Sequence, residues 1–377
     1  MAKGRTARVM RRTAAAAAVL LVAACAYAGY VALRSQATVD LPNPTGPFAV
    51  GRVVGTATDP ARGDRKLSVW TWYPAAAGNG ETAEYAPGAW GGLAIGLPLG
   101  ETRLDRIHDV ARVSAAPAAG RFPLVLLLPG LGFAAPQYAV LAEELASRGY
   151  VVVGVTPTGS ANLTVVDGQA VGPTAEGNPS DFGGEQTAHD RAVGERLLRT
   201  WADDARFAVD WTTSPEGVGL LKGHVDLAHL AYIGHSFGGT TALQACHDDQ
   251  RCRAAVNLDG AIYGSVATEG LDAPSLLVGH DGSCITGECS RTTVTDRADA
   301  AAAETFIAAS AAPVQRATVN GTGHLNFTDY GLYYWAPPLH RLLGLGDADG
   351  RLALSRTGVL VSDVLTHAGV RPELPGN

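Results

Sequence analysis

Residues 230–245, with the sequence LAYIGHSFGGTTALQA, decide the fold of this chain. An apolar run typical of a buried strand comes first, and a helix of small residues comes last. Between them, residues 234–238 (GHSFG) match the pattern G-x-S-x-G, in which a serine occupies a sharp turn from a strand into a helix. The flanking strand and helix distinguish this match from a chance one in a chain with 46 glycines. We therefore interpret Ser236 as a candidate nucleophile.

The chain on both sides of this turn alternates between apolar runs and segments with helical spacing. Strands are expected at residues 50–58, 66–73, 122–130, 150–157, 230–234, 254–258, 275–279 and 314–319, and helices at residues 138–148, 185–213, 237–246, 296–311 and 351–368. The first two strands are expected to pair antiparallel. The remaining alternation predicts a mostly parallel central sheet with helices on both faces, which together with the serine turn indicates an α/β-hydrolase fold. Residues 75–120 are expected to wander over the surface, and residues 158–184 to form a polar loop.

A serine hydroxyl needs a base, and this fold places an acid and then a histidine after the serine in the chain. His324 is the candidate base, because it lies in a loop directly after the strand at residues 314–319. Asp259 and Asp281 are both candidate acids, since each ends a strand at the sheet edge where catalytic groups collect. Most α/β hydrolases use the later position, so the spacing leaves both aspartates open.

Two further histidines lie close to these segments. His280 ends the strand that leads to Asp281 and is not expected to be the base. His235 precedes Ser236 but points away from it at such a turn, so it is expected to be a packed or hydrogen-bonded side chain.

Three motifs resemble the platelet-activating-factor acetylhydrolase family of α/β hydrolases, and the chain is similar to a bacterial member. They are GHSFGG, NLDG and GTGHLNFTD, which begin at residues 234, 257 and 321. The resemblance covers roughly residues 120–335 and implies a triad of Ser236, Asp259 and His324. In the segment LLLPGLG it points to the backbone N–H of Leu131 as one oxyanion-hole donor, with the N–H of Phe237 as the other.

The resemblance implies a serine esterase that hydrolyses short-acyl lipid or phospholipid esters through an acyl-enzyme. A polyester or cutinase-like hydrolase, and a non-catalytic surface binding protein on the same fold, are alternatives. No metal or organic cofactor is expected. The sequence lacks the HExxH and GxxxxGK[ST] motifs, and GxGxxG with its acidic partner.

The N-terminus reads as a targeting segment. Residues 1–12 carry five basic residues and no acid, and residues 13–33 carry no charge. An uncharged helix of this length spans about 30 Å, the thickness of a bilayer core. Residues 1–34 are therefore expected to be a signal anchor, with a cleaved signal peptide or a lipoprotein leader ending at Cys25 as alternatives. Each version exports the protein, which is then membrane-anchored at the cell surface or secreted.

Beyond the leader, three prolines make residues 35–47 an expected stiff linker, and residues 48–377 an expected catalytic domain. The net charge of −7 argues against a nucleic-acid-binding protein.

Cysteine usage agrees with export. Apart from Cys25, four cysteines allow three pairings, and their short spacings favour Cys246–Cys252 and Cys284–Cys289. Neither pair has the CxxC spacing of a metal site.

Overall fold

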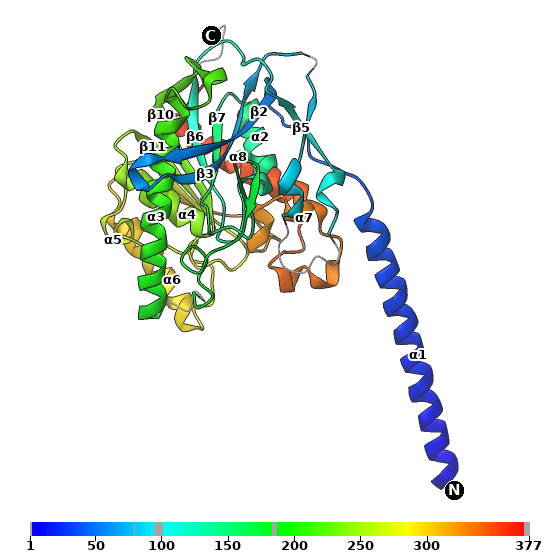
Figure 1. Ribbon diagram of the computed structural model, residues 1–377. Coiled ribbons are helices and arrows are strands. Elements are labelled where there is room, and N and C mark those ends of the chain that lie inside the picture. Colours follow the sequence, from blue (N-terminus) through cyan, green and yellow to red (C-terminus); the bar gives the residue numbers. More distant parts are fainter. Residues whose placement is uncertain (1, 79, 94–100, 183–186, 373–377) are drawn as a thin grey trace.

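The structure is a computed structural model that describes residues 2–78, 80–93, 101–182 and 187–372 (Figure 1). At its centre lies an eleven-stranded sheet with the order β1-β5-β2-β3-β7-β6-β10-β11-β12-β13, in which β4 pairs with β5. The strands of this sheet are β1 (Val39–Asp40), β2 (Ala49–Asp59), β3 (Arg65–Ala75), β4 (Thr82–Glu84), β5 (Ile107–Val113), β6 (Phe122–Leu128), β7 (Val151–Thr156), β10 (Val225–His235), β11 (Cys252–Leu258), β12 (Ser275–Gly279) and β13 (Val314–Thr318). From β7 to β13 each neighbouring pair is parallel.

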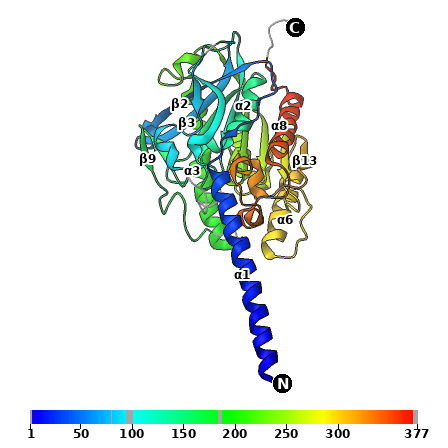
Figure 2. The same cartoon turned by 90° about the vertical axis from the view of Figure 1, so that its right-hand side faces the viewer.

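Helices cover both faces of the sheet (Figures 1 and 2). The α-helices are α1 (Ala2–Ser35), α2 (Ala139–Ser147), α3 (Ala188–Thr213), α4 (Phe237–Asp248), α5 (Val266–Glu269), α6 (Val294–Ala309), α7 (Tyr330–Tyr333) and α8 (Gly350–His367). Short 3-10 helices are η1 (Pro60–Arg62), η2 (Gly88–Gly92), η3 (Leu104–Arg106), η4 (Ala135–Tyr138), η5 (Gly219–Leu221), η6 (His324–Phe327), η7 (Pro337–Leu339) and η8 (Arg341–Leu343).

The continuous apolar runs are explained by two hydrophobic cores, one on each face. Every residue of β6, β7 and β12 is buried. Successive side chains of a strand point to opposite faces. Val125 and Leu127 of β6 therefore join the core beneath α2 and α8, whereas Leu124 and Leu126 join the core beneath α3 and α4. The predicted mostly parallel sheet between two helical layers is confirmed, as is the opening antiparallel pair, β2 and β3.

The expectation that residues 75–120 wander over the surface is wrong for much of the segment that the structure describes. β5 pairs with β1 and β2, β4 pairs with β5, and the side chains of Tyr85 and Trp90 are buried. The sequence of β5, IHDVARV, does not reveal a strand, because one of its buried alternate positions is an acid. This residue, Asp109, forms an ion pair with Arg52 inside the protein. The described part of the predicted polar loop at residues 158–184 likewise contains a hairpin, β8 (Thr164–Val166) and β9 (Gln169–Val171), whereas residues 183 and 184 lie outside the described chain.

Helix α1 projects from the domain as a long rod (Figures 1 and 2). Its residues Met10–Ser35 are long and apolar enough to cross a membrane. Its last turns contact the domain, where Val31 is buried and the guanidinium of Arg34 lies 4.0 Å from the ring centre of Trp335. The segment after α1 follows the domain surface, since Val39–Asp40 pair with β5.

Candidate active site

Ser236 occupies the turn between β10, which ends at His235, and α4, which begins at Phe237. Its backbone has φ 54° and ψ −124°, a conformation that costs a residue other than glycine roughly 1–3 kcal/mol. Glycines on both sides make the turn possible. A Cβ atom at Gly234 would lie 1.9 Å from the carbonyl oxygen of Gly238, and one at Gly238 would lie 2.3 Å from that of Pro129. The turn therefore holds the Ser236 side chain half-buried at the N-terminus of α4.

His324 lies in η6, shortly after β13, and its ring connects the serine to an aspartate. The Nε2 atom is 2.9 Å from Ser236 Oγ, and the Nδ1 atom is 2.6 Å from Asp259 Oδ2. The serine hydroxyl can donate to Nε2 while Nδ1–H donates to the carboxylate. This is the geometry of a serine, histidine and aspartate triad.

Asp259 directly follows β11, and only 3% of its side chain is exposed. Its Oδ1 atom accepts a hydrogen bond from the hydroxyl of Ser283 at 2.7 Å. Burial disfavours the charged form of the carboxyl, but hydrogen bonds from His280 and His324 outweigh it and hold the pKa of Asp259 well below its usual value. The carboxylate is therefore ionised at neutral pH.

Asp281, the other candidate acid, faces a different partner. Its Oδ2 atom accepts a hydrogen bond from the backbone N–H of Gly321 at 2.8 Å. It thereby supports the loop that leads to His324, whereas the carboxylate that reaches the His324 ring is that of Asp259.

The two predicted oxyanion donors lie on segments that meet at Ser236. A Cβ atom at Gly130 would be 3.2 Å from the Cβ atom of Ser236, so the loop that carries Leu131 packs directly on the turn. Phe237 is the first residue of α4. Among the residues that the structure describes, neither the N–H of Leu131 nor that of Phe237 donates a hydrogen bond. Both donors are thus free to bind an oxyanion.

His235 connects three parts of the site through hydrogen bonds. Its Nδ1 atom is 2.8 Å from the hydroxyl of Tyr138, and its Nε2 atom is 2.9 Å from the carbonyl oxygen of His324. Burial lowers the pKa of His235 to about 3, so the ring is neutral and carries one N–H. That N–H must be at Nε2, because a carbonyl can only accept; Nδ1 then accepts from Tyr138. The Tyr138 oxygen in turn accepts from the N–H of Gly130 at 2.9 Å.

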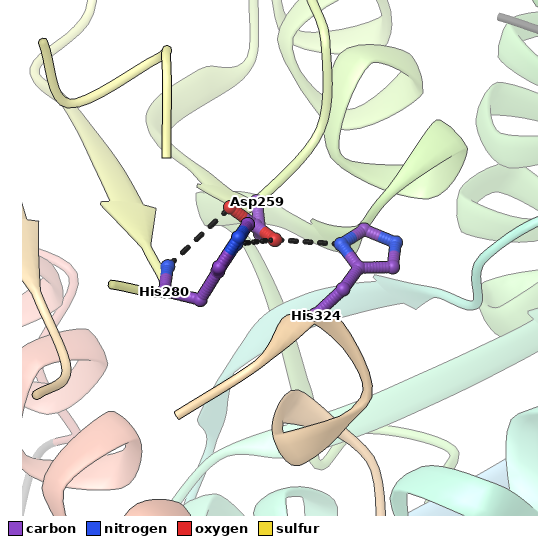
Figure 3. A group of neighbouring side chains, drawn as sticks. All are labelled: Asp259, His280 and His324. Atoms are coloured by element: carbon purple, nitrogen blue, oxygen red, sulfur yellow. Dashed lines mark hydrogen bonds and ion pairs between the residues drawn. The ribbon is translucent and has the colours of Figure 1, made fainter. Parts of the chain in front are cut away.

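His280, which was predicted only to end a strand, is a neighbour of the candidate acid. Its Nδ1 atom lies 2.6 Å from Asp259 Oδ2, so two imidazoles share one carboxylate oxygen (Figure 3). The potential ligand atoms of Asp259, His280 and His324 all lie within 4.8 Å of one another, close enough to bind a metal ion. Within the described chain these atoms are already paired with one another by hydrogen bonds.

The end of the motif GTGHLNFTD positions the base loop. The amide oxygen of Asn326 accepts hydrogen bonds from the N–H groups of Gly323 and Gly346, at 2.8 and 2.7 Å. The carboxyl group of Asp329 caps α2 by accepting from the N–H of Ala139 at 2.9 Å. Burial raises the pKa of Asp329 to about 7. The motif therefore fixes the loop of His324 against its neighbours.

Both cysteine pairs are joined in the structure. The bond between Cys246 and Cys252 connects the end of α4 to the start of β11. The bond between Cys284 and Cys289 closes the loop that begins beside Ser283, a hydrogen-bond donor to Asp259.

Comparison with known proteins agrees with this geometry. Residues 216–357, which include Ser236, Asp259 and His324, match the family model described as platelet-activating factor acetylhydrolase, isoform II. Platelet-activating factor acetylhydrolase of Cavia porcellus is 30% identical over 152 residues, which cover 37% of this chain and 35% of the relative. A probable 1-alkyl-2-acetylglycerophosphocholine esterase of Arthroderma benhamiae is 26% identical over 263 residues, which cover 61% of each chain. The chain thus spans about one third and three fifths of the lengths of these relatives.

Among solved structures, ferulic acid esterase from Streptomyces cinnamoneus superposes with a TM-score of 0.68 and 25% identity. The match covers 88% of this chain and 93% of the esterase. Together with the parallel sheet and its two helical layers, it confirms the α/β-hydrolase fold.

Proposed function

Because the chain is a platelet-activating-factor acetylhydrolase-like α/β hydrolase, we propose that it is a serine esterase that acts on lipid esters with a short acyl chain. The observation that carries the proposal is the continuous hydrogen-bonded series from Ser236 through His324 to Asp259, with lengths of 2.9 and 2.6 Å. A hydroxyl, an imidazole and a buried carboxylate in this order are what acyl transfer from an ester to water requires.

In the proposed reaction, the Ser236 oxygen attacks the ester carbonyl carbon while His324 Nε2 takes the hydroxyl proton. The carbonyl oxygen becomes an oxyanion, which the N–H groups of Leu131 and Phe237 stabilise. When the tetrahedral intermediate collapses, the ester C–O bond breaks and the leaving alcohol takes the proton from His324. A water molecule then repeats the sequence on the acyl-enzyme, which releases the carboxylic acid and restores Ser236.

Asp259 keeps the proton of the neutral His324 ring on Nδ1, so that Nε2 is free to act as the base. Its negative charge also stabilises the imidazolium that forms during each step. The low exposure of the carboxylate strengthens this interaction, because little water is present to screen it.

The side chains around the turn support a short acyl group. The ring of Phe237 packs edge-on against Trp201 and Phe182, with ring centres 5.1 and 6.0 Å apart. Tyr263 completes this cluster, which Leu131 borders. We propose a short acyl group because this apolar cluster packs beside the turn that carries the nucleophile. The acetyl group in the name of the Arthroderma benhamiae relative belongs to the same size class.

We also propose that residues 1–34 anchor the enzyme at the cell surface and that residues 48–377 carry its catalytic activity. The exposed apolar surface of α1 and the two disulfides support an exported, membrane-attached protein.

A series of p-nitrophenyl esters of increasing acyl length, assayed beside a phospholipid with an acetyl ester, tests the proposal. The wild type should hydrolyse the acetyl substrates fastest, and Ser236→Ala should lose activity by about 10⁶-fold, the scale of triad knockouts. A serine-reactive phosphonate should label the wild type at Ser236. Undiminished hydrolysis by Ser236→Ala would refute the proposal, and faster hydrolysis of a polyester film would favour a cutinase-like enzyme.

A further inference from the structure

The carboxylate of Asp259 is held by a second histidine in addition to His324. His280 directly follows β12, and its Nδ1–H points at Asp259 Oδ2 from 2.6 Å, the same distance as that of His324 Nδ1 (Figure 3). The backbone N–H of His280 also faces Oδ1, at 3.4 Å, and Ser283 donates to Oδ1 at 2.7 Å. A triad needs only one of these donors, the ring of His324.

The additional donors stabilise the buried charge of Asp259. An ionised carboxylate that is almost fully buried is unfavourable unless hydrogen bonds replace its lost water. Asp259 directly follows β11, and its carboxylate must face both Ser283 and the His324 ring. The His280 ring approaches Oδ2 from the side opposite to His324 and thereby restricts the direction in which the carboxylate can face (Figure 3).

We propose that His280 is a positioning residue. Its Nδ1–H holds the Asp259 carboxylate in the orientation that accepts the hydrogen bond from His324, and it takes up part of the negative charge that stabilises the His324 ring. This inference rests on the proposed esterase function. His280 acts through Asp259 and does not touch the reacting atoms.

The charges around His280 give the proposal a second consequence. Its side chain is 32% exposed, and within the described chain its Nε2 atom has no hydrogen-bond partner, so solvent can protonate the ring. The hydrogen bond to Asp259 and the charge of Asp281 raise the pKa of His280 above its ordinary value, although burial works against them. The other titratable neighbours are His324, whose ring centre lies 6.4 Å away, and the buried His235, on which the charge of His280 acts. If His280 is removed, more of the Asp259 charge acts on the His324 ring.

The test compares three substitutions of His280 in the full-length protein with p-nitrophenyl acetate as the substrate. Phe fills the volume of the ring without a donor. Asn can place an amide N–H at the position of Nδ1, whereas Gln places it further out, near the position of Nε2. We expect His280→Phe and His280→Gln to lower kcat roughly 10- to 100-fold with little change in KM, the loss seen when a group that orients a catalytic ligand is removed. His280→Asn should retain most of kcat.

The pH profile separates positioning from a merely structural role. In His280→Phe the acid limb of kcat/KM should move upward by about 0.5 pH unit, because the carboxylate charge is no longer shared. Loss of packing alone would lower the melting temperature and leave this limb in place. If His280→Phe fails to fold, the comparison between His280→Asn and His280→Gln still distinguishes positioning from a structural role.

His229 provides a matched control. Its Nδ1 atom lies 2.7 Å from a carboxylate oxygen of Asp226, and its side chain is partly exposed, but it lies in the first half of β10, away from Ser236. His229→Phe should turn over like the wild type.

Wild-type kcat and an unmoved acid limb in His280→Phe would overturn the inference, as would equal losses in Asn and Gln. If the wild type itself does not hydrolyse the ester, or Ser236→Ala does so normally, the proposed function fails instead.

Discussion

Two residues of the candidate triad adopt backbone conformations that side chains other than glycine rarely take. Ser236 has φ 54° and Asp259 has φ 60°. The neighbouring strands hold both in place, since the N–H of Ser236 donates to the carbonyl of Leu258 at 2.8 Å and that of Asp259 donates to the carbonyl of Val278 at 2.7 Å. Strain that persists under such constraints is a feature of sites whose geometry matters more than local stability.

The choice between the two candidate acids is testable residue by residue. Asp259→Asn should lower kcat by up to about 10⁴-fold, because an amide in this position favours the wrong tautomer of His324. Asp281→Asn should retain most activity, since its carboxylate supports the backbone of Gly321 and not the ring. Steady-state kinetics of both variants, with circular dichroism to verify folding, provide the measurement. A dead Asp281→Asn beside an active Asp259→Asn would place the acid on the later strand.

Ser236 and His324 could be predicted from local sequence patterns. Ser236 lies in a strand-to-helix turn, and His324 lies in the loop after a strand. Choosing Asp259 over Asp281 needed a family resemblance, because both end strands at the same sheet edge. The role of His280 could not be predicted, since it depends on which way its ring turns and on a partner 21 residues away. For the same reason sequence could not show that His235 joins Tyr138 to the backbone of His324, residues 97 and 89 positions from it.

At the scale of secondary-structure elements, the loop of the base and helix α2 are joined through Asp329. Its carboxyl group accepts hydrogen bonds from the N–H groups of Ala139 and Val140, at 2.9 and 3.3 Å, and from the hydroxyl of Tyr85 at 3.1 Å. The group is fully buried, and its pKa of about 7 lies above the ordinary value of 3.8. A carboxyl that anchors the base loop is thus expected to titrate near neutral pH.

This shift predicts how stability depends on pH. Between about pH 4 and pH 7 the folded protein keeps a proton on Asp329 that the unfolded chain has lost, so this group's stabilisation is complete below this window and is lost as pH rises through it. The slope contributed is at most about 1.4 kcal/mol per pH unit. In Asp329→Asn this contribution disappears, while the amide oxygen can still accept from α2.

Urea unfolding of the wild type and Asp329→Asn at several pH values measures the effect. The free energy of unfolding of the variant should rise relative to that of the wild type as pH increases through the window. The pKa of the nearby Glu143 is also raised, mainly by burial and in part by the charge of Asp329, so the same pair of measurements is repeated in a Glu143→Gln background. A difference that does not change with pH would show that Asp329 is ionised throughout.

The elements themselves were predictable to different degrees. β6, β7 and β12 are buried on both faces, so their sequences are continuous apolar runs, and β12 occupies the predicted residues 275–279. β5 is a short strand near one end of the sheet, with alternate residues at least partly exposed, and its pairing with β2 spans more than 50 positions in the chain. A short strand of this kind carries too little periodicity to be distinguished from a loop.

At the scale of the whole molecule, the described structure consists of one compact domain and the projecting helix α1 (Figure 2). The segment between them, residues 35–47, is predicted to be a linker, and in the structure it forms hydrogen bonds with the domain. Leu41 is buried, and the N–H and hydroxyl of Thr45 donate to the carboxylate of Glu144 at 2.8 and 2.6 Å. The N–H of Gly46 donates to the hydroxyl of Ser147 at 3.0 Å. We therefore expect the folded unit to begin just after α1.

Two truncated chains test where the folded unit begins and what α1 does. A chain that starts at Gln36 keeps β1 and the contacts of Thr45, and it retains every residue of the candidate triad; it should be soluble and as active as the full-length protein. A chain that starts at Phe48 loses Leu41 and these contacts, and it should melt at a lower temperature while it keeps the triad. Full-length protein should sediment with membranes and resist extraction with high salt, because an apolar helix of this length is held by the bilayer core and not by charge. Recovery of the full-length product mainly in the culture medium, with a new N-terminus near residue 27, would show that the helix is a cleaved signal. Equal melting temperatures of the two truncated chains would instead show that residues 36–47 are the linker that their prolines suggest.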